Sequence, residues 1–187
     1  MILGIVLVII VIVVVGIVIW WIRTYNALIG LRNSKDESFS AMDVYMKKRY
    51  DLIPNLVETV KGYAKHEKET LEKVIQARSD AFNASGVEEK MKAEQGLTGA
   101  LKSLIALSET YPDLKANTNF LDLQNQLKEI EGEISNSRRF YNARVKDLNN
   151  KIEMFPSNIV AKHYKFEKAT LFELDSIEER KNVKVEF

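Results

Sequence analysis

The chain has 187 residues, with 27 lysines and arginines against 26 aspartates and glutamates, and a formal net charge of +1 at pH 7. This balance excludes the strongly basic surface typical of nucleic-acid-binding domains and the like-charge run of a polyacidic tail. The sequence contains no cysteine, which excludes disulfides, thiol nucleophiles and cysteine-ligated zinc. With 3 prolines and 8 glycines, the composition favours long helices over many short strands.

The first 22 residues carry no charged side chain and are apolar almost throughout. At about 1.5 Å per residue a helix of this length spans roughly 33 Å, which is enough to cross the hydrocarbon core of a bilayer. Trp20 and Trp21 close the segment, where indole rings favour the membrane interface. We therefore predict an uncleaved transmembrane anchor over residues 1–22.

A secretory signal peptide is the alternative for this segment. It needs a basic start, a shorter apolar stretch and a small-residue cleavage site. No lysine or arginine precedes the run and no such site ends it, which favours the anchor. Arg23, Arg32 and Lys35 follow the span, so the positive-inside rule predicts a single-pass protein of the cell membrane with its soluble domain in the cytoplasm.

Apolar residues at helical spacing continue past the anchor, at Leu28, Phe39, Met42, Met46 and Ile53. No helix breaker separates this stretch from the anchor, so the first helix is expected to leave the bilayer as one rod. Pro54 lacks a backbone donor and clashes with the preceding turn, which predicts a kink or a restart. The stripe resumes at Leu56. It ends before a turn at residues 83–86, with Ser85 as the expected N-cap of the next helix.

A third helix is expected to end at Tyr111-Pro112, because the residue before proline avoids helical angles, and Asp113 is expected to start the fourth. Apolar residues spaced by seven follow along the fourth helix, at Phe120, Leu127, Ile134, Tyr141, Leu148 and Phe155. Such a sustained heptad predicts a seam buried against partner helices. Pro156 stops the pattern. Residues 183–187 alternate with period two, which predicts an extended end.

The predicted fold class is all-α, with an N-terminal transmembrane helix followed by an antiparallel bundle of about four long helices. The predicted domains are the anchor at 1–22, the helical bundle at 23–158, and an amphipathic and extended tail at 159–187. Gly96 and Gly99 lie inside the third helix, where each costs about 1 kcal/mol relative to alanine. We therefore expect a close approach to a neighbouring helix at these two positions.

The sequence assigns no catalytic, cofactor-binding or metal-binding residue. His66-Glu67 begins a zincin pattern, but Thr70 occupies the place of the second histidine, four residues on, where the metal needs it. His66 is therefore interpreted as a surface residue on a charged helix face. No phosphate-binding GxxxxGK motif is present.

Two runs of charge have ordinary interpretations. Glu129, Glu131 and Glu133 are expected to form a solvated helix face. Lys47, Lys48 and Arg49 are spread around the helix by its geometry and form no stripe, and the cluster is smaller than most lipid-binding patches.

Several longer strings resemble the bacterial LemA family. They are Tyr-Asn at 25–26, Lys-Lys-Arg-Tyr-Asp-Leu-Ile-Pro-Asn-Leu-Val at 47–57 with its continuation to 67, Tyr-Pro-Asp-Leu-Lys-Ala-Asn at 111–117, Asn-Phe-Leu at 119–121, Arg-Arg-Phe-Tyr-Asn at 138–142, and Phe-Pro-Ser-Asn-Ile at 155–159. Their order and spacing also match, from the anchor to about Leu174. The resemblance implies a membrane anchor with a bundle of long antiparallel helices, and it implies no chemical activity.

The resemblance also implies partners by analogy. Genes of the family often neighbour a gene for a membrane metalloprotease, and one relative belongs to the magnetosome membrane set. The leading hypothesis is a non-enzymatic, membrane-anchored scaffold or adaptor in envelope organisation, which binds a protein partner or its own copies and no nucleic acid. The alternatives are a regulatory partner of a membrane protease and an enzyme with an unrecognised site, which substitution of Arg49 or His66 would reveal.

Overall fold

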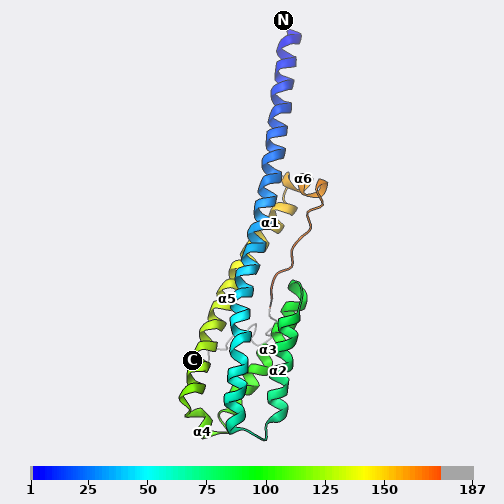
Figure 1. The fold of residues 1–187 in the computed structure, drawn as a ribbon. Coiled ribbons are helices and arrows are strands. Elements are labelled where there is room, and N and C mark those ends of the chain that lie inside the picture. The colour runs from blue at the N-terminus through cyan, green and yellow to red at the C-terminus, as the bar shows by residue number, and fades with distance from the viewer. Residues whose placement is uncertain (1, 174–187) are drawn as a thin grey trace, which may run out of the picture. The chain divides into compact units, whose positions relative to one another are not determined.

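The computed structural model describes residues 2–173, which contain six helices and no strand. The helices are α1 (Ile2–Tyr63), α2 (Lys68–Asn83), α3 (Val87–Leu107), α4 (Pro112–Lys115), α5 (Thr118–Glu153) and α6 (Ser157–His163) (Figure 1). The all-α class is confirmed, and α1, α2, α3 and α5 are the long helices. The extended end predicted at residues 183–187 lies outside the described residues.

Helix α1 is continuous over 62 residues and passes through Pro54. The expectation that the anchor and the stretch after it form one helix is confirmed. Of the two alternatives predicted at Pro54, a kink or a restart, the restart is wrong, because the helix continues past the proline. A proline deprives one carbonyl of its partner, the oxygen four residues earlier, which here belongs to Tyr50. Arg78 Nε donates to that oxygen at 2.6 Å, so the helix continues because a side chain of α2 replaces the missing backbone donor.

The described chain divides into two compact units. Unit 1 contains residues 2–40 and 139–171, and unit 2 contains residues 41–138 and 172–173. Helices α1 and α5 contribute residues to both units, whereas α2, α3 and α4 belong to unit 2 and α6 belongs to unit 1.

Unit 1 begins with the apolar start of α1, which is long and apolar enough to cross a membrane and has none of its most apolar stretch buried. Farther along, α5 packs antiparallel to α1. The rings of Phe39 and Tyr141 lie 5.6 Å apart, and Leu28 and Leu148 share a buried cluster with residues of α6. Figure 1 shows α6 beside α1.

The segment after α6 returns along α5. Asn149 makes two hydrogen bonds to Ala169, donating to its carbonyl at 2.9 Å and accepting from its N–H at 2.8 Å. The Tyr141 hydroxyl donates to the Thr170 carbonyl at 3.0 Å. These side chains satisfy the backbone of a segment that has no helical or sheet partners of its own.

Unit 2 buries the apolar stripes of α1, α2, α3 and the start of α5. The buried apolar residues are Met42, Met46, Tyr50, Ile53, Leu56, Val57, Val60, Ala64, Leu71, Val74, Ala81, Leu97, Leu101, Leu104, Leu114, Phe120, Leu127, Ile134 and, after α6, Phe172. Helices α2 and α3 lie side by side, joined by a three-residue connection, so the two helices run antiparallel.

The heptad predicted along α5 is confirmed at its first five positions. Phe120, Leu127, Ile134, Tyr141 and Leu148 are all buried. The sixth member, Phe155, is 79% exposed, so its predicted burial is wrong. Helix α5 ends at Glu153, and the heptad periodicity no longer applies beyond that residue.

Three other local expectations are corrected. Gly86, with φ 79°, caps α3 in place of Ser85, since a left-handed residue at this turn suits glycine. Helix α3 ends at Leu107, before the residues expected to end it. Helix α5 is capped by Asn117, whose side-chain oxygen accepts from the Phe120 N–H at 2.9 Å, so Asp113 belongs to the short α4 instead.

The close helix approach expected at Gly96 and Gly99 is also wrong. A side-chain carbon added at either position would meet nothing within 4 Å. These two glycines therefore have no packing contact that requires them.

Candidate functional site

The most distinctive feature of unit 2 is a buried ion cluster centred on Arg49, which is 1% exposed. Its guanidinium donates to Glu94 of α3 through Nη2 and to Glu131 of α5 through Nη1. The Tyr50 hydroxyl donates to the second oxygen of Glu94. A buried charge is tolerated only when it is paired and hydrogen-bonded, so these contacts tie α1, α3 and α5 together in one register.

A second cation extends the cluster toward α2. Lys90 is buried, and its ammonium lies 3.1 Å from Asp43 Oδ1 and 3.4 Å from the Ala81 carbonyl. The same ammonium lies 5.6 Å from the centre of the Tyr50 ring, within the range of a cation–π contact. We refer to Asp43, Arg49, Tyr50, Lys90, Glu94 and Glu131 as the charged cluster.

Burial raises the pKa of Tyr50 to about 12, with Arg49 opposing the shift and Asp43 adding to it. The phenol therefore keeps its proton at neutral pH and donates to Glu94. Arg49 Nε has no hydrogen-bond partner among the described residues. The cluster thus pairs two buried cations with three carboxylates from different helices, an arrangement that specifies how the helices pack.

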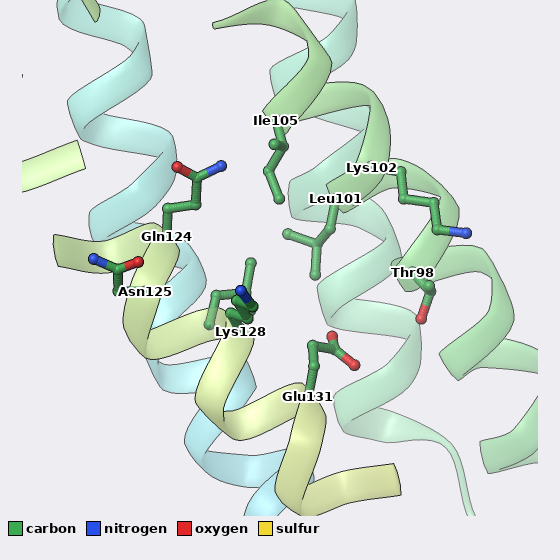
Figure 2. A pocket seen from close by; sticks show the side chains of 9 residues that line it. Thr98, Leu101, Lys102, Ile105, Gln124, Asn125, Lys128 and Glu131 are labelled. Carbon is green, nitrogen blue, oxygen red and sulfur yellow. The ribbon is translucent and has the colours of Figure 1, made fainter. Parts of the chain in front are cut away.

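An open groove of about 560 Å³ adjoins the cluster between α3 and α5. Its lining residues are Thr98, Leu101, Lys102, Ile105, Gln124, Asn125, Leu127, Lys128 and Glu131. Figure 2 shows Leu101 and Ile105 projecting from α3 toward α5. Leu101 and Leu127 are buried and form an apolar floor, while lysine and amide side chains line the rim. Because Glu131 belongs to both features, the groove is continuous with the charged cluster.

A second depression, of about 610 Å³, lies between the end of α1 and α2. It is lined by Val57, Glu58, Lys61, Gly62, Lys65, Lys68, Leu71, Glu72 and Ile75. Three lysines surround its apolar floor, but it shares no residue with the charged cluster. The α3–α5 groove is the stronger candidate because its geometry is set by buried ion pairs.

The structure separates the members of the basic run at residues 47–49. Lys47 is exposed and pairs with Asp51 at 3.3 Å, and Lys48 is exposed over the Tyr45 ring. Arg49 is buried, so it is not available to lipid, and its role is one that the sequence interpretation missed. The spacing carried a signal: Arg49 lies three residues after Met46 and four before Ile53, on the same buried face.

The acidic run is divided in the same way. Glu129 and Glu133 are exposed, as expected, but Glu131 is half-buried and bound to Arg49, so its interpretation as a purely solvated side chain is wrong. His66 is exposed as expected, but it lies in the turn between α1 and α2, not on a helix face. Within residues 2–173, no group of three or more histidine and acidic side chains is placed to hold a metal ion.

Comparison with known proteins gives two levels of similarity. A model of the LemA family matches residues 38–187. A protein LemA from Metamycoplasma hominis is 30% identical over 158 residues, which cover 82% of this chain and 70% of that protein. The magnetosome proteins MamQ 1 and MamQ 2 of Paramagnetospirillum magneticum are each 24% identical over 175 residues, 80% of this chain. The chain spans 64% of the length of each magnetosome protein.

Proposed function

Because the chain belongs to the LemA family and α1 joins a membrane-length apolar span to a helical bundle, we propose that the protein is a membrane-anchored, non-enzymatic scaffold or adaptor in the organisation of the bacterial cell envelope. The observation that carries the proposal is the continuity of α1. One helix without a break joins the apolar span to residues of both compact units. The magnetosome relatives support a role at a membrane.

The α3–α5 groove supports the binding half of the proposal. An apolar floor with a polar rim suits an amphipathic helix laid into the groove. Lys102 and Lys128 on the rim favour acidic residues beside the apolar face of that helix. The proposed occupant is such a helix of another membrane protein, and the charged cluster keeps α3 and α5 at the spacing it requires.

The bundle is proposed to lie on the cytoplasmic side. Arg23 is exposed directly after the apolar span, and Arg32 is also exposed, as the positive-inside rule favours for a cytoplasmic flank. The chain has no cysteine, so Ser85→Cys gives a unique label in an exposed turn. A membrane-impermeant maleimide should label it only after the cells are permeabilised, and labelling of intact spheroplasts would place the bundle outside.

Affinity capture from crosslinked native membranes tests the scaffold. The tag is placed within residues 83–86, an exposed turn between α2 and α3. Mass spectrometry compares the wild type with a Lys102→Glu/Lys128→Glu variant, which alters the groove rim without touching its floor. Lys48→Glu/Lys92→Glu is the matched control, because both lysines are exposed in unit 2 and neither lines the groove.

The scaffold proposal predicts a partner that the wild type and the control recover and the groove variant loses. Equal recovery by all three proteins, or recovery of no partner, would contradict it. Recovery of a membrane protease through the groove would instead assign the protein as that protease's regulatory partner. A catalytic rate of the pure chain that disappears with His66→Ala, or with Arg49→Met while the variant keeps its folded circular dichroism spectrum, would contradict the non-enzymatic assignment.

A further inference from the structure

The turn between α5 and α6 presents three large apolar side chains to the outside of unit 1. Phe155 is 79% exposed, Met154 is 63% exposed and Ile159 is 49% exposed. They are close in sequence, and α5 ends immediately before the first two. A group of apolar residues that stays exposed next to a packed core indicates an interaction surface.

Contacts within unit 1 bring this turn to the end of the apolar span. Helix α5 runs back along α1, so its residues approach the span as its residue numbers rise: Tyr141 meets Phe39, and Leu148 packs with Leu28. Ile152, Trp20 and Trp21 are partly buried and all pack against this same cluster. The α5–α6 turn, which begins two residues after Ile152, therefore lies near the tryptophans that end the span.

Aromatic contacts hold the end of α6 beside the tryptophans that end the apolar span. The Trp21 ring lies 5.4 Å from His163 and 6.4 Å from Tyr164, and its indole N–H donates to the Tyr164 hydroxyl at 3.4 Å. Tyr25 and Tyr164 lie 4.5 Å apart. Tryptophan and tyrosine rings concentrate at the level of the lipid headgroups, which is where these contacts place α6. Figure 1 shows α6 against α1 where the uncovered part of α1 begins.

The charges around the turn suit a lipid surface. Lys162 and Lys165 are exposed on either side of the exposed His163-Tyr164 pair. Two acidic residues lie near the turn: Glu153, the last residue of α5, is paired with Lys168 at 2.8 Å, and Glu167 is exposed two residues after Lys165. Lysines therefore outnumber acidic side chains in this part of unit 1. Apolar side chains flanked by lysines match the pattern of segments that lie in the membrane interface and attract anionic lipids.

We propose that the α5–α6 turn is a second membrane contact, with Met154, Phe155 and Ile159 inserted into the interfacial layer of the bilayer that α1 spans. Lipid is the occupant because the turn lies near the tryptophans that end the span, so the same bilayer reaches both. One helix through a bilayer leaves its tilt and rotation free to change. A second contact, at the end of the span, restricts both the tilt and the rotation of the helix and so orients unit 1 on the membrane. The inference rests on α1 lying in the membrane, but not on the scaffold function.

Spin labelling of the full chain tests the contact, since the absence of cysteine allows single-site labels. Phe155→Cys and Ile159→Cys carry nitroxides in vesicles of phosphatidylcholine and phosphatidylglycerol. Val13→Cys, within the exposed apolar start of α1, is the positive control. Ile75→Cys and Phe82→Cys are the matched negative controls, because both are apolar residues of unit 2 that are 52% exposed. Power saturation measures collisions with oxygen, which enriches in lipid, and with a nickel chelate, which stays in water.

The proposal predicts that labels at 155 and 159 collide several-fold more with oxygen relative to nickel than labels at 75 and 82. The proposal would be overturned if the nickel chelate reached the label at 155 as readily as the labels at 75 and 82, while the label at 13 was buried in lipid. Protection of 155 from both reagents would also overturn it, in favour of a protein or second-copy contact. Water access at 13 would instead reject the anchor itself, which separates the failure of this inference from failure of the proposed function.

Discussion

Units 1 and 2 are both built from helices, but they bury different kinds of polar side chain. The buried polar side chains of unit 1, within residues 2–40 and 139–171, are the hydroxyls of Thr24, Ser38 and Ser157. Unit 2 buries three charged residues, Arg49, Lys90 and Glu94. Apolar contacts tolerate small shifts between helices because they are not directional, whereas buried charges must meet named partners. Unit 1 is therefore expected to tolerate substitution, and unit 2 to depend on single residues.

The largest effect is expected at Arg49. Arg49→Met leaves Glu94 buried without its cationic partner, which should cost about 3–5 kcal/mol of unfolding free energy. Urea unfolding of the full chain in detergent, followed by circular dichroism, measures it. Lys47→Met is the matched control two residues away, because its ion pair with Asp51 is exposed and should contribute less than about 1 kcal/mol. Equal costs for the two variants would remove the charged cluster as the organising feature of unit 2.

Alkaline pH should weaken both units through one buried tyrosine in each. Burial raises the pKa of Tyr50 to about 12, and burial with the nearby Asp36 raises the pKa of Tyr141 to about 12. A raised folded pKa contributes stability that is complete below the unfolded value of 10.0 and is lost as the pH rises from 10 to 12. Tyr141→Phe should therefore lose less stability than wild type over that interval, as should Tyr50→Phe. A variant with the wild-type pH slope would contradict the assignment for its residue.

A third test addresses the passage of α1 through Pro54. Arg78→Met removes the donor to the Tyr50 carbonyl and should cost about 1–3 kcal/mol, because that acceptor is left unpaired. Pro54→Ala restores the backbone N–H, so Arg78→Met should cost clearly less in that background. A double-mutant cycle by urea unfolding measures the coupling. Strict additivity would show that Arg78 does not compensate for the proline.

The smallest effect is expected at the end of α6 in unit 1. Lys165 has φ 54° and follows the end of α6. The Lys165 N–H donates to the Lys162 carbonyl, and the Phe166 N–H donates to the Ala161 carbonyl at 2.9 Å. Glycine is favoured at such a left-handed position, so Lys165→Gly should stabilise the chain by about 0.5–1 kcal/mol. Lys162→Gly, inside α6, should have the opposite sign. A loss of stability in both variants would contradict this account of the helix end.

Much of the architecture could be predicted because it depends on patterns of residues that are close together in the sequence. The apolar span, the heptad from Phe120 to Leu148 and the turn at residues 83–86 depend on neighbours in sequence, and the structure bears them out. The LemA resemblance is likewise confirmed by the family match over residues 38–187. The domain boundaries and the absence of an enzymatic activity stay predictions.

The errors arose where the outcome depends on another helix. Local rules predicted a kink or a restart at Pro54, but Arg78, 24 residues later in the chain, supplies the missing donor and the helix continues. Arg49 looked like a surface charge because its partners, Glu94 and Glu131, lie 45 and 82 residues away. The groove was not predictable for the same reason, since its two walls come from different helices. The cap at Asn117 depends only on neighbours in sequence. An asparagine just before a helix is a preferred N-cap, so this residue could have been predicted.

Photo-crosslinking from the groove in living cells tests the central claim most directly. A benzophenone side chain replaces Lys128 or Gln124 on the groove rim, and Lys92, exposed on α3 and outside the groove, provides the control position. The scaffold account predicts a covalent adduct with one other membrane protein from both groove positions and none from position 92. No adduct from the groove, or the same adduct from position 92, would contradict the claim that this family member works by holding a partner against its α3–α5 surface.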